Sequence, residues 1–125
     1  MTGKIYWATF KYYDNVSHRM AFKKRPVLII GKADKKDYVV LPVSRVTQRE
    51  HLDPHYDFEL QSKDYPALSF KTTSYIRTHK QTIVNSGELA DCIADFREEY
   101  PDAYISVIAL VEEFQKELLD NAFGG

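Results

Sequence analysis

Residues 25–43, RPVLIIGKADKKDYVVLPV, contain two apolar runs joined by a short charged segment. Val27–Gly31 is continuously apolar and ends in glycine, a pattern typical of a buried strand. The charged residues 32–37 favour a hairpin turn. Tyr38–Val43 is then the returning strand, and Pro42 lies near the point where that strand stops pairing. This hairpin predicts that the chain is built on an antiparallel sheet.

Further strand signals lie on both sides of the hairpin. Lys4–Phe10 is rich in aromatic and β-branched residues and predicts a strand with both faces partly covered. Residues 11–24 show no period and are expected to form a long loop, and Arg45–Tyr56 is expected to be a second, mobile polar loop. Short strands are predicted at Asp57–Leu60, Ala67–Phe70 and Thr73–Thr78. Several short strands with close turn signals and no helix between them indicate a small antiparallel barrel.

The pattern becomes helical at Asn85. Asn85 and Glu88 have the spacing of a capping box, and the apolar residues that follow recur at helical intervals. The first expected helix carries Leu89, Ile93 and Phe96, and the second, after Tyr100-Pro101, carries Tyr104, Ile108, Val111, Phe114/Gln115 and Leu118. The expected fold is therefore α+β. It is a single domain over residues 1–125, with a barrel at about 3–84 and a helical part at about 86–123.

The composition is that of a globular chain with a strong charge polarity. The 125 residues are 44% hydrophobic and 28% charged. Residues 1–50 hold eleven Lys/Arg and four Asp/Glu (net +7), whereas residues 81–125 hold two and ten (net −8). A basic half suits a polyanion, although lopsided charge is also common on ordinary solvated surfaces. The sequence shows no apolar signal core and no run near the ~20 residues that span a bilayer, so a cytoplasmic protein without membrane contact is expected.

No residue pattern indicates a metal or a nucleotide cofactor, so none is expected. His51 and His55 are four residues apart, but Asp53-Pro54 interrupts the helix that a metal site with this spacing needs. The single cysteine, Cys92, excludes an internal disulfide. It lies on an acidic segment, where carboxylates disfavour a reactive thiolate, and is expected to be a small core residue.

Polar residues at strand ends are the remaining candidates for chemistry. They are Arg25 and Ser44, at the two ends of the hairpin, and Arg77 and His79, at the end of a later strand. Arginine gives a phosphate fixed bidentate charge, a hydroxyl can orient a phosphate oxygen, and histidine can act as a base or an acid near neutrality. Each residue also has an ordinary explanation, such as a salt bridge, a turn cap or a surface histidine.

Four segments together resemble the PemK/MazF family of endoribonuclease toxins from bacterial toxin–antitoxin pairs. In chain order they are KIYW at 4–7, KRPVLII at 24–30, LPVS at 41–44, and SYIRTH at 74–79 followed by QTI, so the resemblance covers about residues 4–90. It implies an SH3-like barrel, a homodimer and metal-independent, sequence-selective cleavage of single-stranded mRNA. Attack by the 2′-OH would leave 2′,3′-cyclic phosphate and 5′-hydroxyl ends. A separate antitoxin protein would neutralise the resulting inhibition of growth.

The resemblance also assigns roles by motif position. Arg25 and Arg77 match transition-state stabilisers, and Ser44 occupies a hydroxyl position that is usually Thr. His79 stands where several members place an acidic residue and is the expected general base or acid. His18 lies in the first loop, about where many members carry Gly-His-Glu, and is a second candidate acid or base. This loop departs from the family because no Glu follows His18, and the acidic C-terminal segment is longer than expected.

The basic half also supplies candidates for RNA contacts. In-line attack requires a nucleotide splayed out of a helix, so single-stranded RNA is the expected substrate. The aromatic residues Tyr12, Tyr13 and Phe22 can stack on bases, and packing in a core or a dimer contact explains them equally well. The candidate contacts to the RNA backbone are Lys11, Arg19, Lys23, Lys24 and Arg45.

Two other functions fit the same residues. One is an inactive PemK/MazF-like module that binds only nucleic acid or an antitoxin, as the altered first loop suggests. The other is a structural SH3-like interaction domain whose acidic helices bind a partner. Metal-free cleavage separates the enzyme from the first alternative, and RNA affinity that falls steeply with salt separates it from the second.

Overall fold

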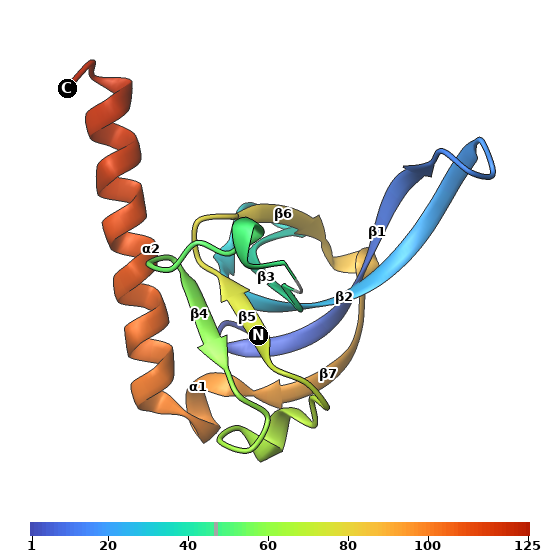
Figure 1. Ribbon diagram of the computed structural model, residues 1–125, viewed down its shortest axis with the longest axis horizontal. Coiled ribbons are helices and arrows are strands. Elements are labelled where there is room, and N and C mark those ends of the chain that lie inside the picture. The colour runs from blue at the N-terminus through green and yellow to red at the C-terminus, as the bar shows by residue number, and fades with distance from the viewer. Residues whose placement is uncertain (47) are drawn as a thin grey trace.

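The computed structural model describes residues 1–46 and 48–125, and it has an α+β fold in which a curled antiparallel sheet is followed by a C-terminal helix (Figure 1). The strands are β1 (Lys4–Asp14), β2 (Arg19–Lys32), β3 (Asp37–Ser44), β4 (Asp57–Leu60), β5 (Ser74–Arg77), β6 (Thr82–Asn85) and β7 (Leu89–Asp95). A short α1 (Phe96–Glu99) precedes the long α2 (Pro101–Ala122). Single 3₁₀ turns lie at Arg49–His51, Pro66–Leu68 and Ser86–Glu88.

The strand order explains the curl of the sheet. The order is β4-β5-β3-β2-β1-β7, and β6 also pairs with β3. β3 pairs with β2 along one edge and with two strands in succession along the other, Val40 lying opposite Thr82 of β6 and Val43 opposite Ile76 of β5. β5 continues to β4, whereas the only strand that pairs with β6 in the described residues is β3, and the whole sheet is curled into a half-barrel (Figure 1).

Apolar side chains on the two faces of the sheet form two clusters. The inner cluster consists of Ile5, Leu28, Leu41, Val43, Leu60, Leu68, Ile76, Phe96 and Val107. The outer cluster consists of Ala8, Val27, Ile29, Val40 and Val84. Successive residues of β2 therefore alternate between clusters, as the side-chain period of a strand requires. α2 joins the inner cluster through Val107, and each fully buried Leu, Ile, Val or Phe stabilises the fold by about 1.5–3 kcal/mol.

Several sequence predictions are confirmed. The hairpin at residues 25–43 forms the end of β2 and β3, and Leu28 lies opposite Leu41. The predicted strand Asp57–Leu60 is β4, and Thr73–Thr78 contains β5. α2 begins at Pro101, since proline lacks the N–H that would be unpaired in the first turn.

The predicted loop at residues 11–24 is wrong. β1 and β2 continue as an antiparallel ladder as far as Asp14 opposite Arg19, and this hairpin arm projects from the rest of the sheet (Figure 1). Its outer part has both faces in solvent, since the neighbouring residues Tyr12 and Tyr13, which point to opposite faces, are 46% and 54% exposed. Hydrophobic alternation reports which face is buried, so a strand with two exposed faces has no such pattern. The aromatic content of the segment is the strand signal that remains.

The predicted first C-terminal helix is also wrong. The capping box exists, because the Asn85 side chain accepts a hydrogen bond from Gly87 N–H and Glu88 accepts one from Asn85 N–H, but it caps only a 3₁₀ turn. The chain then forms β7, which pairs with β1 and shifts register twice. These bulges place Leu89 against the outer cluster and Ile93 against the inner one. In a regular strand, residues four apart point to the same face, but the bulges turn Leu89 and Ile93 to different faces. Both residues can therefore be apolar and partly buried at the four-residue spacing that is typical of a helix.

Three smaller expectations also differ from the structure. Ala67–Phe70 is not a strand, because Pro66 opens a 3₁₀ turn and Ser69 has φ of 57°. Cys92 is exposed on β7 rather than packed in the core. The polar segment Arg45–Tyr56 contains a 3₁₀ turn, and position 47 of that segment lies outside the described residues.

Candidate nucleic-acid interface

Arg25 and Ser44 face each other across β2 and β3. Val27 lies opposite Pro42, and continuing this antiparallel register by two residues brings Arg25 opposite Ser44. The Arg25 Nη1 donates a hydrogen bond to Ser44 Oγ at 3.1 Å. The apolar runs that set the register of the hairpin therefore also set the geometry of this polar pair.

Arg77 reaches the same place from the end of β5. Val43 and Ser44 of β3 pair with Ile76 and Tyr75 of β5, so the end of β5 lies beside the end of β3. The Arg77 guanidinium is held by Asp57, and its Nη2 also donates to the carbonyl oxygen of His51 at 2.8 Å. These contacts hold the Arg77 guanidinium near the adjoining ends of β3 and β5.

A small pocket of about 320 Å³ brings these residues together. It is lined by Arg25, Ser44, Arg45, Val46, Gln48, His51 and Arg77. Three arginines and a histidine thus converge with a hydroxyl and an amide from segments that are far apart in the chain. Such a set supplies fixed positive charge, hydrogen-bond donors and one titratable group within a single concave site.

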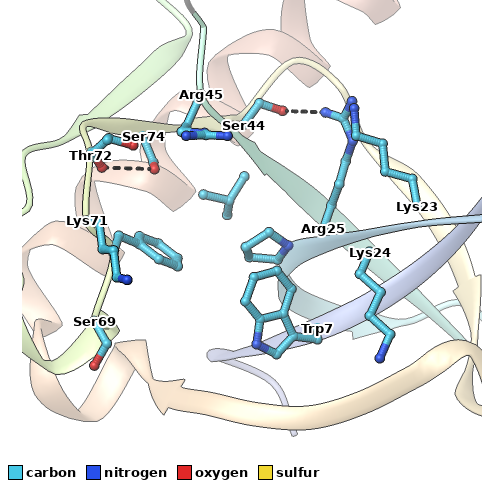
Figure 2. A pocket seen from close by; sticks show the side chains of 13 residues that line it. Trp7, Lys23, Lys24, Arg25, Ser44, Arg45, Ser69, Lys71, Thr72 and Ser74 are labelled. Atoms are coloured by element: carbon cyan, nitrogen blue, oxygen red, sulfur yellow. Dashed lines mark hydrogen bonds between the residues drawn. The ribbon is translucent and has the colours of Figure 1, made fainter.

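A larger pocket of about 500 Å³ continues from the small one and shares Arg25, Ser44 and Arg45 with it (Figure 2). Its other lining residues are Trp7, Lys23, Lys24, Pro26, Val43, Ser69, Phe70, Lys71, Thr72 and Ser74. We call the two pockets together the cleft. The described residues that line the cleft include no Asp or Glu, so in a chain of net charge −1 this surface is strongly cationic. A cationic cleft with a tryptophan and a phenylalanine suits a phosphate-bearing chain of bases.

His79 lies outside the lining of the cleft. Its ring is packed near Tyr56 and Phe114 of α2, with ring centroids 5.9 and 6.2 Å away, and its side chain is 13% exposed. The Nδ1 atom is 3.8 Å from Asp57 Oδ1 and has no hydrogen-bond partner. Burial lowers the pKa of His79, although Asp57 and Asp53 pull the other way. The residue is therefore neutral near pH 7, and Asp57 lies between it and the Arg77 guanidinium as a shared neighbour.

His18 lies far from the cleft. It has φ of 56° in the turn that closes the hairpin arm, and its N–H donates to the Asp14 carbonyl at 2.8 Å. Seven residues of extended chain separate His18 from Arg25, which corresponds to roughly 20 Å. The structure therefore does not bring His18 together with Arg25, Ser44 and Arg77.

The predicted RNA-contact residues divide into two groups. Lys23, Lys24 and Arg45 line the cleft. Lys11 and Arg19 lie on the hairpin arm, where both are exposed. Lys11 and Arg19 point to opposite faces of the arm, so the five residues do not form one continuous surface.

The structure adds residues that the sequence analysis did not select. His51 lines the small pocket, and Trp7, Phe70 and Lys71 line the large one. The sequence predicts only a polar loop around His51, because nothing in the local sequence shows that Arg77 will bind the His51 carbonyl. The sequence predicts that Trp7 is part of a strand with partly covered faces. The residue is 37% exposed, so part of the ring is available to a ligand in the cleft.

α2 is tied to the segment beside the cleft by two side-chain pairs. Glu113 Oε1 lies 2.8 Å from His55 Nε2, and the Tyr56 hydroxyl donates to Glu117 Oε2 at 2.6 Å. The hydrogen bond to Glu117, together with burial and the negative charges nearby, raises the pKa of Tyr56 to about 12. No helix in the described part of the chain is both long and apolar enough to cross a membrane.

Compared with models of known protein families and with curated protein sequences, the chain matches none.

Proposed function

We propose that this protein is a metal-independent endoribonuclease of the PemK/MazF toxin type, acting on single-stranded RNA. The observation that carries the proposal is the convergence of Arg25 from the middle of β2, Ser44 from the end of β3 and Arg77 from the end of β5 in one pocket, which His51 also lines. Arg25, Ser44 and Arg77 are three of the five catalytic residues that the sequence resemblance selects; His79 and His18 do not line this pocket, and His51 was not selected. Positive charge and a titratable imidazole beside one another are what metal-free cleavage of a phosphodiester requires.

In the proposed reaction the 2′-oxygen attacks phosphorus and the bond to the 5′-oxygen breaks. The ribose 2′-OH gives its proton to a base, and the leaving 5′-oxygen takes a proton from an acid or from water. His51 is the candidate for the base or the acid, because it is the one histidine among the described residues that line the pocket. Arg25 and Arg77 stabilise the charge of the phosphorane, and Ser44, held by Arg25, orients a phosphate oxygen. His79 remains a candidate acting through Asp57.

The resemblance supplies the rest of the proposal. The curled sheet is a variant of the SH3-like barrel, the active form is a cytoplasmic homodimer, and a separate antitoxin neutralises the toxin. An acidic, disordered segment of the antitoxin would suit the cleft, since the described cleft residues are cationic and include no carboxylate.

The test is incubation of the purified protein with a long, mostly unstructured RNA in EDTA, with the fragment ends mapped. Discrete cuts with 5′-hydroxyl and 2′,3′-cyclic phosphate ends are expected. Arg25→Ala should slow cleavage by about 10²–10³. Lys35→Ala, which removes a charge from the β2–β3 turn at the other end of these strands, is the matched control and should cut normally. Intact RNA with folded protein overturns the proposal.

A second candidate function is a binding module that grips RNA without cutting it. The observation that favours it is the pairing of Arg77 with Asp57, which offsets the positive charge that a transition state would need. Under this alternative the wild type binds RNA, with an affinity that falls steeply with salt, and the RNA stays intact.

A further inference from the structure

The outer part of the hairpin arm displays aromatic and cationic side chains on one face. The register of β1 and β2 runs without a shift from Ile5 opposite Leu28 to Asp14 opposite Arg19. Side chains two apart on a strand share a face, and so do directly opposed residues. One face therefore carries Trp7, Lys11, Tyr13, Met20, Phe22 and Lys24, which we call the strip.

The large side chains of the strip are exposed and contribute little to the fold. Trp7 is 37%, Tyr13 54%, Met20 55% and Phe22 65% exposed. None of them belongs to the inner or outer cluster. Apolar residues gathered on one exposed face, rather than scattered singly, mark a surface that binds something.

The strip is continuous with the cleft. Trp7 and Lys24, at its base, line the large pocket (Figure 2). From Trp7 the face runs outward through Lys11 opposite Phe22 to Tyr13 opposite Met20. Tyr13 is six positions after Trp7 on β1, so the strip extends about 20 Å from the cleft toward the tip of the arm.

The composition of the strip indicates its occupant. Lys11 and Lys24 alternate with the aromatic residues, and the β1 and β2 residues of this face from Trp7 to Met20 include no Asp or Glu. Asp91 of β7 lines a third hollow with Trp7 and Lys24, which places a carboxylate at the base of the strip. Lysine is depleted at the centre of protein–protein interfaces, whereas cations interleaved with aromatic rings are the usual surface for single-stranded nucleic acid.

We propose that the strip is a second binding region for single-stranded RNA, in which the rings of Trp7, Phe22 and Tyr13 stack on successive bases that leave the cleft. Lys11 and Lys24 contact the phosphates. This inference rests on RNA being the ligand of the cleft, as proposed above. It gives the arm a function that does not involve His18 at its tip.

The opposite face of the arm supplies a matched control. Tyr12 is next to Tyr13 on β1, is 46% exposed, and points to the other face, opposite Ala21. Replacing Tyr12 or Tyr13 by alanine removes the same group from the same exposed strand. A difference between the two variants in RNA affinity therefore reports which face is used.

The experiment measures binding of two unstructured oligonucleotides, one of about 12 nucleotides and one of about 4, to the full chain. The readouts are fluorescence anisotropy of labelled RNA and quenching of Trp7, the only tryptophan in the chain. The double variant Tyr13→Ala/Phe22→Ala should bind the long RNA at least about 10-fold more weakly. Loss of the stacking on a single base already weakens binding by roughly 5-fold or more, and the variant loses two such contacts. Its binding and cleavage of the short RNA should be those of wild type, and Tyr12→Ala should behave as wild type with both.

Other outcomes separate the two proposals. If the wild type cuts RNA but the double variant binds the long RNA normally, or Tyr12→Ala is equally weakened, the strip proposal fails and the nuclease stands. If strip-dependent binding occurs without cleavage, the nuclease fails and the strip stands. If the double variant instead dissociates a wild-type dimer in light scattering, with RNA affinity unchanged, the strip is a contact between two copies of the chain and the proposal is overturned.

Discussion

Arg77 donates Nε and Nη2 to the two carboxylate oxygens of Asp57, at 3.0 and 3.3 Å, and the Asp57 side chain is fully buried. The same carboxylate accepts the backbone N–H of Asp53 at 2.8 Å. Asp57 therefore joins the end of β5 to the segment that carries His51. One buried carboxylate orients both the guanidinium and the loop that form one side of the small pocket.

Asp57→Asn should lower the free energy of unfolding by about 3 kcal/mol, because it leaves one member of a buried ion pair without its charge partner. Removing one partner of a buried ion pair usually costs about 3–5 kcal/mol. We expect the low end of this range, because the Arg77 side chain is 21% exposed and can turn toward water. Urea denaturation measures the effect, and Asp64→Asn, at an exposed site, is the control. A loss no larger than that of the control would show that the pair does not stabilise the fold.

His51→Ala and His79→Gln should separate the two candidate acid–base residues. If His51 transfers the proton, its loss should slow cleavage by about 10²–10⁴ with little change in RNA affinity. His79→Gln should change the stability of the fold and leave most of the cleavage rate, since His79 packs against Tyr56 and Phe114 outside the cleft lining. Single-turnover cleavage rates measure both. A folded His79→Gln protein that cannot cut, beside an active His51→Ala, would reverse the assignment.

The lowered pKa of His79 gives the fold a defined pH dependence. Burial pushes this pKa below the ordinary value of 6.5, so the unfolded chain binds a proton more readily than the native one. The contribution of His79 to stability is thus fully present above pH 6.5 and is lost as the pH falls through the lowered native pKa. Urea midpoints of wild type should fall with acidification in this window. In the His79→Gln variant, the urea midpoint should fall less steeply with acidification than in wild type. If the two proteins show the same dependence of the midpoint on pH, His79 is not the cause.

The central hairpin and the Arg25–Ser44 pair follow from the sequence, because both depend on local information. Continuous apolar runs on each side of a charged turn set the pairing of Leu28 with Leu41, and the polar pair lies three positions along from it in that register. The start of α2 at Pro101 depends on a local proline rule in the same way. These features could be predicted because the residues that determine them are close together in the chain.

Three features of the structure could not be predicted from the sequence: the strand β7, the extended hairpin arm and the place of His51 in the pocket. β7 has a helical apolar spacing because its two register shifts against β1 redirect its side chains. The hairpin arm has no burial pattern because its outer faces meet solvent. His51 enters the pocket because its carbonyl binds Arg77, which lies 26 residues away. In none of these three cases does a burial pattern within the segment indicate the structure that forms.

Gly3 lies where a side chain cannot be accommodated. Its φ is 89°, and a Cβ atom would lie 2.7 Å from Arg97 Cβ. Its carbonyl also accepts the Arg97 N–H at 3.0 Å, which joins the start of β1 to α1. Gly3→Ala should destabilise the fold by about 1–3 kcal/mol. Gly31→Ala is the matched control, because a Cβ there meets open space at an ordinary φ. Equal thermal midpoints for the two variants would contradict the expected strain.

The hydrogen bond from Tyr56 to Glu117 should govern both the titration of Tyr56 and the order of the end of α2. The bond to Glu117, then burial and the charge of Glu117, raise the pKa of Tyr56 to about 12 from an ordinary 10.0. Because the native state favours the hydroxyl form, this contribution to stability is present below pH 10 and is lost as the pH rises through about 12. Glu117→Gln should therefore bring the pKa of Tyr56 back toward 10.

The measurement is an NMR titration of the tyrosine rings, with Tyr56→Phe used to assign Tyr56 among the nine tyrosines. Glu112→Gln, at an exposed position of α2, is the control and should leave the titration unchanged. Hydrogen exchange in the last turns of α2 should be faster in Glu117→Gln than in the control, because Leu118 and Leu119 are 48% and 54% exposed and add little packing there. An unchanged titration with slow exchange would show that packing alone holds this end of the helix.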